Sequence, residues 1–364
     1  MATPSAPAVR EARPGMAGPF PALDLSHLRA MTDSTGLIQH ARFSVPHYDE
    51  GYCIDDNARA LLLMTLLEQG AHGYDPELGL LASRYLAFVN HAFNPELGRF
   101  RNFMGYSRLW QEVQGSEDSH GRALWALGAT AGQSCDPGRR ALAGRLFQAG
   151  LPAVRTFAHP RSWAYALLGV QHYLASFPSD PQVAPLESLL AGRLQDCHRR
   201  ASGPGWQWFE DRVTYSNARL PQALLRSGIR HHRQDWTGIG LDCLEWLARV
   251  QSDPQGRFAP VGSNGFFTRG GSMARFDQQP VDACATVSAC LDAGAASGES
   301  KWRERALEAF SWFLGRNQVG LPLYDSHTGG CRDGLHAGSV NQNQGAESTL
   351  SFLLALVEMD KSRV

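Results

Sequence analysis

The sequence has few of the features that mark secreted, membrane-spanning or metal-binding proteins. Its seven cysteines are an odd number and include no C-x-x-C pair, so neither a disulfide framework nor a zinc site is expected. Most of them lie in expected helices, which is typical of reduced thiols in the cytoplasm. No run approaches the roughly 18 apolar residues of a membrane-spanning helix. We therefore expect a cytoplasmic protein without a membrane anchor.

An excess of one charge sign is also absent. The 34 Lys and Arg residues balance 35 Asp and Glu residues, for a formal net charge of −1. A balanced chain offers no basic surface to nucleic acid or to an anionic membrane, so neither is expected as a partner. The first segment, residues 1–21, is rich in Pro, Ala and Gly and lacks the apolar stretch of a signal peptide. It is predicted to be a flexible tail.

Six segments of the chain share one pattern, in which polar residues lead directly into a helix of Ala, Gly, Ser and Leu. A helix that is apolar on most of its faces is typically buried. The chain has 364 residues and 43% hydrophobic content, which is enough for one large core. The six segments align on Asn57, His120, Trp163, Asn217, Asp282 and Glu347.

Amphipathic helices are expected between these buried ones. In "SKWRERALEAFSWFLGRN", for example, Trp302, Phe310 and Phe313 fall on one face and charged residues fall opposite. Four similar segments follow the same pattern, and a sixth is expected at "PALDLSHLRAMTDSTG". Alternation of six buried and six amphipathic helices predicts an all-α fold, an (α/α)6 double barrel. An α-solenoid or two smaller bundles are alternatives, but no linker divides the chain, so residues 22–364 are predicted to form one domain.

Three outer helices run into similar turns, namely "FNPELGRFRNFMG", "SDPQGRFAPVGSNG" and "RNQVGLPLYDSHTGG". Each combines Asn or Asp with Gly before a short β-like stretch, which is typical of hairpin loops. We expect these loops at the end of the barrel where the inner helices begin. Polar and aromatic side chains would then converge on one rim.

The segment "HYDEGYCIDDNAR" places two adjacent carboxylates, Asp55 and Asp56, at the start of an apolar helix. One aspartate is sufficient to cap a helix. Two carboxylates held together raise the pKa of one of them, which keeps an acid protonated near neutral pH. We therefore take the pair as candidate catalytic acids, with Tyr48, Asn57 and Arg59 beside them as candidate substrate-binding residues.

The segment "GSEDSHGRALW" gathers charged residues before a helix interior that has none. Capping of the helix is the alternative explanation for Glu117 and Asp118. Arg122 and Arg59 occupy matching positions in their repeats, and each can pair with neighbouring carboxylates. We take Glu117 and Asp118 as candidate catalytic residues and His120 and Arg122 as candidate binding residues.

The segment "GPGWQWFEDRVTYSN" places Trp206 and Trp208 on the same side of a strand-like stretch. Indole faces stack on sugar rings, and carboxylates and amides bind hydroxyl groups. Burial in the core is the alternative for either tryptophan. Further candidate sugar-binding residues along the chain are Trp110, Trp163, Glu210, Asp211 and Asn217.

Two polar loops before the last two buried helices complete the candidate site. The first, "FFTRGGSMARFDQQPVDACATVS", contributes Gln279 and Asp282, and the second, "YDSHTGGCRDGLHAGSVNQNQGAEST", is dense in side-chain amides. Such a loop suits a ligand with many hydroxyl groups. It supplies His336, Asn343, Gln344 and the candidate acid Glu347. No G-x-G-x-x-G, P-loop or nucleophile elbow is present, and neither a cofactor nor a metal is expected.

These motifs resemble those of the six-hairpin glycosidase superfamily. "YCIDDNARALLL" is similar to the Asp-Asp motif of its endo-α-mannanases, in which adjacent aspartates act as nucleophile and acid/base. "DEGYCIDDNARAL", "SEDSHGRALWALG", "FDQQPVDA" and "NQGAESTL" also resemble a helical domain often attached to bacterial glycosyltransferases. The resemblance implies carbohydrate as the substrate and a mannanase-like role for Asp55 and Asp56.

The sequence therefore predicts a glycoside hydrolase that acts on oligosaccharides, with mannose-containing ones implied by the resemblance. One carboxylic acid would protonate the leaving oxygen while a second carboxylate activates water or attacks the sugar. Asp56 and Glu117 form the first predicted pair, with Asp55, Asp118 and Glu347 in reserve. The axes of adjacent inner helices are about 8–10 Å apart, so two such acids could face each other across a water, which favours inversion.

Two other functions fit the same pattern. Sugar 2-epimerases use the same double ring with histidines as proton carriers, for which His120, His327 and His336 are the candidates. Acids outnumber histidines in the motifs, which favours hydrolysis. The third function is that of a non-catalytic carbohydrate-binding protein whose partner is a separate glycosyltransferase. Such a protein would keep the aromatic and amide residues without needing closely opposed acids.

Overall fold

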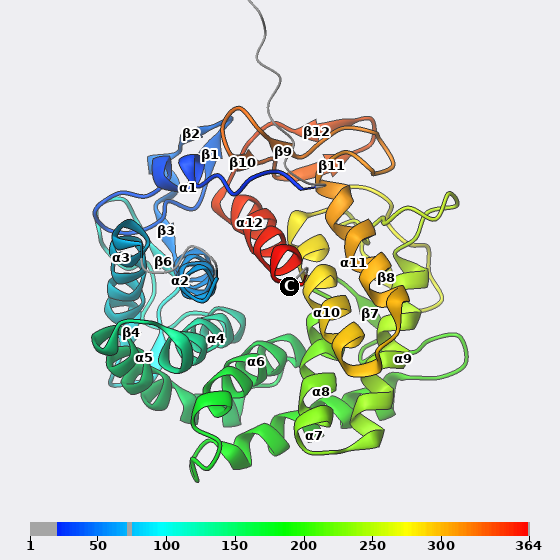
Figure 1. Cartoon of the computed structure of the whole chain (residues 1–364), viewed down its shortest axis with the longest axis horizontal. Coiled ribbons are helices and arrows are strands. Elements are labelled where there is room, and N and C mark those ends of the chain that lie inside the picture. Colours follow the sequence, from blue (N-terminus) through cyan, green and yellow to red (C-terminus); the bar gives the residue numbers. More distant parts are fainter. Residues whose placement is uncertain (1–19, 71–74, 363–364) are drawn as a thin grey trace, which may run out of the picture.

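Two concentric rings of helices form the body of the computed structural model, which describes residues 20–70 and 75–362 (Figure 1). The inner ring is built from the segments that the sequence predicts to be buried, and each begins near the residue on which those segments align. Its helices are α2 (Ile54–Glu68), α4 (Glu117–Gln133), α6 (Pro160–Ser176), α8 (Arg219–Arg230), α10 (Pro280–Ser297) and α12 (Ala346–Lys361).

The outer ring covers the inner one with the predicted amphipathic helices. Five of them pack against the inner helix that precedes them in the chain. They are α3 (Pro76–Ala92), α5 (Pro137–Gly150), α7 (Ala184–Ala201), α9 (Gln234–Val250) and α11 (Ser300–Phe313). The sixth, α1 (Ser26–Ala30), packs on α12 and has only five residues, so the expected N-terminal helix is shorter than its segment suggests.

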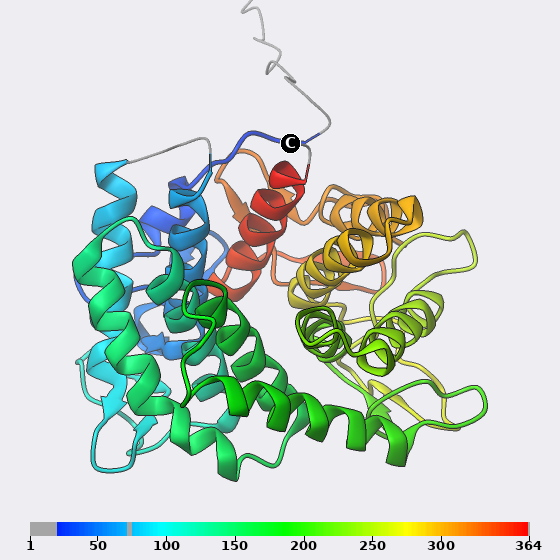
Figure 2. The same ribbon diagram turned by 60° about the horizontal axis from the view of Figure 1, so that its bottom comes forward.

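The inner ring is closed. Each inner helix contacts the next one in the chain, and α12 contacts α2, beside which it lies in both views (Figures 1 and 2). The predicted all-α (α/α)6 barrel is therefore confirmed. Of the helices described, none is long and apolar enough to cross a membrane.

Short antiparallel hairpins and bridges connect the helices, together with the 3-10 helices η1 (Tyr48–Glu50) and η2 (Leu151–Thr156). Two of the three predicted hairpin loops form paired strands, and the third forms a single bridge between Ser252 and Phe258. The paired strands are β1 (Ala41–Arg42) with β2 (Val45–Pro46), β3 (Tyr52–Cys53) with β6 (Phe103–Met104), β4 (Phe93–Asn94) with β5 (Arg99–Phe100), β7 (Arg212–Val213) with β8 (Phe267–Thr268), β9 (Tyr324–Asp325) with β10 (Gly330–Cys331), and β11 (Gly334–His336) with β12 (Ser339–Asn341).

Small residues set the spacing of the inner ring. Where α4 crosses α6, a Cβ atom added to Gly128 would lie 2.2 Å from the carbonyl oxygen of Gly169. The two backbones therefore touch directly, which only glycine permits at this point. Large aromatic side chains instead fill the space between the rings, among them the fully buried Trp302, Phe310 and Phe352.

The predicted flexible tail, residues 1–21, lies outside the described residues except for its last two. The boundary of a single domain at residue 22 stays a prediction.

The contact between α4 and α6 predicts that Gly128→Ala lowers the free energy of unfolding by about 1–3 kcal/mol, since an added methyl group forces the helices apart. Gly192 offers a matched control in the interior of α7, where an added Cβ meets nothing within 4 Å. Gly192→Ala should raise stability by about 0.5–1 kcal/mol, because alanine favours helix. Urea denaturation monitored by circular dichroism measures both, and equal stability of the two variants would contradict the direct backbone contact.

Candidate active site

A pocket of about 290 Å³ opens where α2 and α12 begin. Four carboxylic acids line it, together with one arginine, one histidine and side chains of the adjoining loops. The lining residues are Gln39, His40, Cys53, Asp55, Asp56, Arg59, Phe103, Gln279, Asp333, Gly345, Glu347 and Ser348. Five of them, namely Asp55, Asp56, Arg59, Gln279 and Glu347, are residues that the sequence predicts for the site.

Arg59 joins two of these acids across neighbouring helices. Its Nη1 donates to Oδ1 of Asp56 at 2.9 Å, and its Nη2 donates to Oε2 of Glu347 at 2.5 Å. The second oxygen of Asp56 accepts a hydrogen bond from Sγ of Cys53 at 3.0 Å. One guanidinium group therefore holds the carboxylates of α2 and α12 close together.

The environments of the acids drive their pKa values apart. Burial raises the pKa of Asp55, against the charge of Arg122, and it raises that of Asp56 to about 6, against the charge of Arg59. Burial also acts to raise the pKa of Glu347, but the charges of Arg59 and Arg122 outweigh it and hold the pKa below its usual value. Glu347 remains open to the pocket, since 43% of its side-chain surface is accessible. An ionised carboxylate thus lies beside carboxyls that hold their protons to higher pH.

The network continues from α2 to α4 and α6. Nε of Arg122 lies 3.7 Å from Oδ2 of Asp55, and its Nη2 donates to the hydroxyl of Tyr165 at 2.6 Å. Asp118 accepts hydrogen bonds from Ser162 at 2.7 Å and Tyr215 at 2.6 Å. Asp118 therefore lies within the network, although it does not line the pocket.

A third arginine continues the network on the far side of the ring. Arg161 of α6 donates to Glu210 at 2.7 Å and to Oδ1 of Asn217 at 3.3 Å. The backbone and side-chain nitrogens of Asn217 in turn lie 3.4 and 3.2 Å from Oδ1 of Asp282 in α10. Burial raises the pKa of Asp282 to about 7. Contacts among arginines, acids, amides and hydroxyl groups thus link, in turn, the starts of α12, α2, α4, α6, α8 and α10.

Several predicted site residues serve the fold instead. Glu117 accepts hydrogen bonds from the backbone nitrogens of Ala158 and His159 at the start of α6, so the structure does not place it in the pocket. His120 is fully buried, with Nε2 2.9 Å from the carbonyl oxygen of Gly150. Asn57 is also fully buried and bonds the backbone of Leu37. The predicted binding roles of His120 and Asn57 and the catalytic role of Glu117 are corrected accordingly.

Three of the four predicted tryptophans are buried in the core, and the fourth is partly buried. Trp208 is fully buried, and Trp206, 4% exposed, packs on Trp246. Trp163 is 8% exposed and donates to the carbonyl oxygen of Phe157, while Trp110 is partly buried against the ring of Phe88. Alternation along a strand predicts which residues share a side, but not whether that side faces solvent, so the prediction for Trp206 and Trp208 was wrong.

The remaining predicted residues lie in the loops above the barrel. Tyr48 is 49% exposed and stacks on Tyr106, with ring centroids 4.6 Å apart. Asp211 is exposed, 3.8 Å from Arg269. Three others bond neighbouring loops: His336 pairs with Asp277, Asn343 accepts from the backbone nitrogen of Phe43, and the buried Gln344 donates to Asp325.

Seven pocket residues were not among the predicted site residues: Gln39, His40, Cys53, Phe103, Asp333, Gly345 and Ser348. His40, Phe103 and Asp333 come from loops and short strands between the aligned motifs, where no periodicity identifies them. Cys53 carries a signal in hindsight, since it directly precedes the two aspartates. Across the described ranges, no three His, Cys, Asp or Glu side chains are grouped closely enough to hold a metal ion.

Comparison with known proteins identifies the fold. No protein-family profile and no curated protein matches the chain. Among solved structures, cellobiose 2-epimerase from Bacillus thermoamylovorans has a TM-score of 0.72 at 11% identity and covers 93% of this chain and 96% of its own. Cellobiose 2-epimerase from Spirochaeta thermophila has a TM-score of 0.72 at 14% identity, with 94% of each chain covered.

A mannanase shares the same architecture. An inactive variant of the α-1,6-mannanase of Salegentibacter sp. HEL1_6, solved with α-1,6-mannotetrose, has a TM-score of 0.62 at 9% identity and covers 93% of this chain and 96% of its own. The predicted resemblance to the six-hairpin fold is therefore confirmed.

The buried Asp282 predicts a specific pH dependence of stability. Its pKa of about 7 in the folded chain lies above the ordinary aspartate value of 3.8, so the folded state binds the proton more tightly than the unfolded state. This carboxyl therefore stabilises the fold fully below about pH 4, and its contribution is lost as the pH rises toward 7. Asp282→Asn should match the wild type near pH 4 and be more stable by roughly 1–4 kcal/mol at pH 8.

Urea denaturation at both pH values measures the difference. Asp211→Asn, at an exposed position, is the control and should show no such pH-dependent gain. If Asp282→Asn were less stable than the wild type at pH 8, the folded chain would favour the ionised form of Asp282, against this prediction.

Proposed function

We propose that the protein is a glycoside hydrolase that acts on oligosaccharides. The observation that carries the proposal is the bridge from Arg59 to Asp56 and Glu347 in the wall of an open pocket. It brings acids from the two ends of the chain into one site, and the surroundings separate their pKa values. Pairs of carboxyls with separated pKa values are what acid/base cleavage of a glycosidic bond requires.

The surroundings favour different roles from those that the sequence predicts. Asp55 faces the pocket with a raised pKa and is suited to act as the general acid. Glu347 is kept ionised and is suited to act as the general base. Asp56, whose oxygens are bound by Arg59 and Cys53, would position Arg59 instead. Asp55 and Glu347 thus replace Asp56 and Glu117 as the proposed pair.

The proposed reaction proceeds by inversion. Asp55 gives its proton to the glycosidic oxygen as the bond between that oxygen and the anomeric carbon breaks. A water molecule attacks the anomeric carbon from the other face and passes a proton to Glu347. The positive charge of Arg59 keeps Glu347 unprotonated until that step. One water is consumed, and one hydroxyl forms on each product.

A mannose-containing substrate is the finer part of the proposal. It is supported by the fold shared with the α-1,6-mannanase, whose inactive form has two consecutive aspartates changed to alanine. Asp55 and Asp56 form such a consecutive pair. The exposed Tyr48 and Tyr106, with Phe103 in the pocket wall, would contact sugar units beyond the cleaved bond.

A second candidate function is 2-epimerisation of a sugar, which is supported by the high TM-scores with the two epimerases. The histidines predicted for this chemistry do not line the pocket: His120 is buried, His327 is exposed, and His336 pairs with Asp277. Of the described histidines, His40 alone lines it. Incubation with a reducing disaccharide, followed by NMR, separates the two functions, since hydrolysis yields two monosaccharides and epimerisation yields one new disaccharide.

Asp55→Asn and Glu347→Gln should each lower kcat by roughly 10²–10⁴-fold, because each removes one proton-transfer group. Turnover of defined manno-oligosaccharides, followed by NMR, measures the loss. Glu117→Gln and Asp211→Asn are the controls and should retain turnover, since neither residue lines the pocket. Activity lost in Glu117→Gln but kept in Glu347→Gln would reverse the assignment.

Sugar binding without turnover in the wild type would support a non-catalytic partner of a glycosyltransferase.

The pH profile of kcat/KM should be bell-shaped, with its acidic limb below the usual glutamate pKa and its basic limb above the usual aspartate pKa. The acidic limb reports Glu347, which must be ionised and whose pKa is lowered. The basic limb reports Asp55, which must be protonated and whose pKa is raised. Arg122 lowers both pKa values, so Arg122→Met should move both limbs to higher pH, and Arg122→Lys should keep them nearer the wild-type positions. Limbs that do not move in Arg122→Met would exclude these two acids as the groups that titrate.

A further inference from the structure

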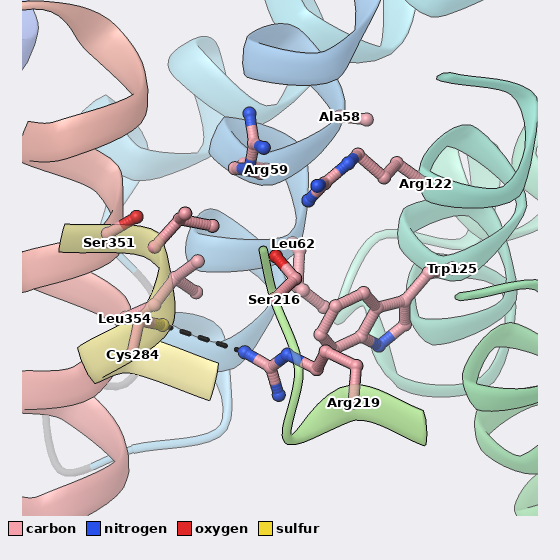
Figure 3. Close-up of a pocket in the computed structure, with 11 residues that line it drawn as sticks. Ala58, Arg59, Leu62, Arg122, Trp125, Ser216, Arg219, Cys284, Ser351 and Leu354 are labelled. Atoms are coloured by element: carbon pink, nitrogen blue, oxygen red, sulfur yellow. Dashed lines mark hydrogen bonds between the residues drawn. The ribbon is translucent and has the colours of Figure 1, made fainter. Parts of the chain in front are cut away.

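A small cavity of about 20 Å³ lies inside the inner ring, next to the arginines that hold the acids (Figure 3). Side chains from α2, α4, α8, α10 and α12, and Ser216 from the loop before α8, line it. They are Ala58, Arg59, Leu62, Arg122, Trp125, Ser216, Arg219, Val281, Cys284, Ser351 and Leu354. Three guanidinium groups thus surround one cavity, and the carboxylic acids of the neighbouring pocket are not in its lining.

Arg219 differs from the other buried arginines of the barrel. Arg59, Arg122 and Arg161 each have a carboxylate within 4 Å. Arg219 is 5% exposed and has no such partner among the described residues. It donates to Oε1 of Gln222 at 2.8 Å and weakly to Sγ of Cys284 at 3.6 Å. A buried charge normally requires a counter-charge, and this one lacks it.

No carboxylate of the described residues contacts Arg219. The guanidinium of Arg219 lies over the ring of Trp125, 4.7 Å from its centroid. Glu358 of α12 interacts with Arg219 through space without contacting it, and its carboxyl accepts a hydrogen bond from the hydroxyl of Ser288. Burial raises the pKa of Glu358 against the charge of Arg219.

One further donor at the cavity is incompletely satisfied. The hydroxyl of Ser216, buried near that of Tyr165, makes no hydrogen bond of normal geometry within the described chain. Nε of Arg122 makes none either, but it faces Asp55 at 3.7 Å. Figure 3 shows the Ser216 hydroxyl between the guanidinium groups of Arg122 and Arg219. The cavity therefore presents N–H and O–H donors and a positive charge that no described carboxylate contacts.

We infer that this cavity binds one small monovalent anion such as chloride, held by Arg219 and Arg122 with the hydroxyl of Ser216. A cavity of about 10–15 Å³ is the least that holds one water, so 20 Å³ has room for a single small ion of that size class. The anion supplies the charge that Arg219 lacks and fixes Arg122, the residue beside Asp55. The inference does not depend on the proposed hydrolase activity.

Binding can be measured on the full-length protein without a substrate. In a gluconate buffer of constant ionic strength, ³⁵Cl NMR should show a saturable broadening of the chloride signal. Bromide should displace chloride and give an anomalous scattering peak between Arg122 and Arg219 in soaked crystals, whereas sulfate should not compete. Broadening that never saturates, or a water at that position in bromide-soaked crystals, would overturn the inference.

Variants locate the site. Arg219→Met should abolish the saturable signal. Ser216→Gly should weaken chloride binding by about tenfold, the usual effect of losing one hydrogen bond to a charged group. Ser216 has a φ of 46°, which glycine adopts readily, so this variant should fold even if Arg219→Met does not. Arg226→Met is the matched control on the same helix, since Arg226 does not line the cavity and lies near Asp292. Equal chloride affinity in Ser216→Gly and the wild type would exclude this position.

Discussion

The buried arginines of the inner ring are the constraint on which the candidate site depends. Placing charged groups at the starts of apolar helices is unfavourable unless each finds an opposite charge or a hydrogen bond. Arg59, Arg122 and Arg161 stand on successive inner helices, and each reaches a carboxylate. Two of these arginines pair with an acid on another inner helix, so the same contacts hold adjacent hairpins together and set the positions of the acids.

This arrangement explains how carboxyls of one site acquire different properties. Asp55, Asp56 and Glu347 share one pocket and two arginines, yet the arginine charges dominate at Glu347 and burial dominates at the aspartates. The difference arises from where the guanidinium groups lie rather than from the type of acid. The unpaired charge of Arg219 is the exception in this scheme, and the proposed anion would supply its counter-charge.

The sequence predicts the barrel well because its signal is repeated. Six helices of mostly small and aliphatic residues alternate with amphipathic ones, and each polar segment lies where an inner helix begins. The acids Asp55, Asp56 and Glu347 and the arginine Arg59 were predicted for the same reason, since they stand at equivalent points of the repeat. What the repeat does not contain is the direction of a side chain at the rim. Glu117 turns to the backbone of the next hairpin, and His40 and Asp333 enter from loops whose paths no pattern in the sequence reveals.

The direct backbone contact of Gly128 with Gly169 also makes the barrel more rigid at that point than elsewhere in the inner ring. At that crossing no side chain separates α4 from α6, so no change of rotamer can let the two helices slide or spread at this point. The starts of the inner helices are joined through side chains instead, as between Arg122 and Tyr165 or between Arg59 and Glu347, and the long side chains of the latter pair can pivot. Widening of the pocket to admit or release a large ligand should therefore pivot at the contact of Gly128 with Gly169 and open where Arg59 joins α2 to α12.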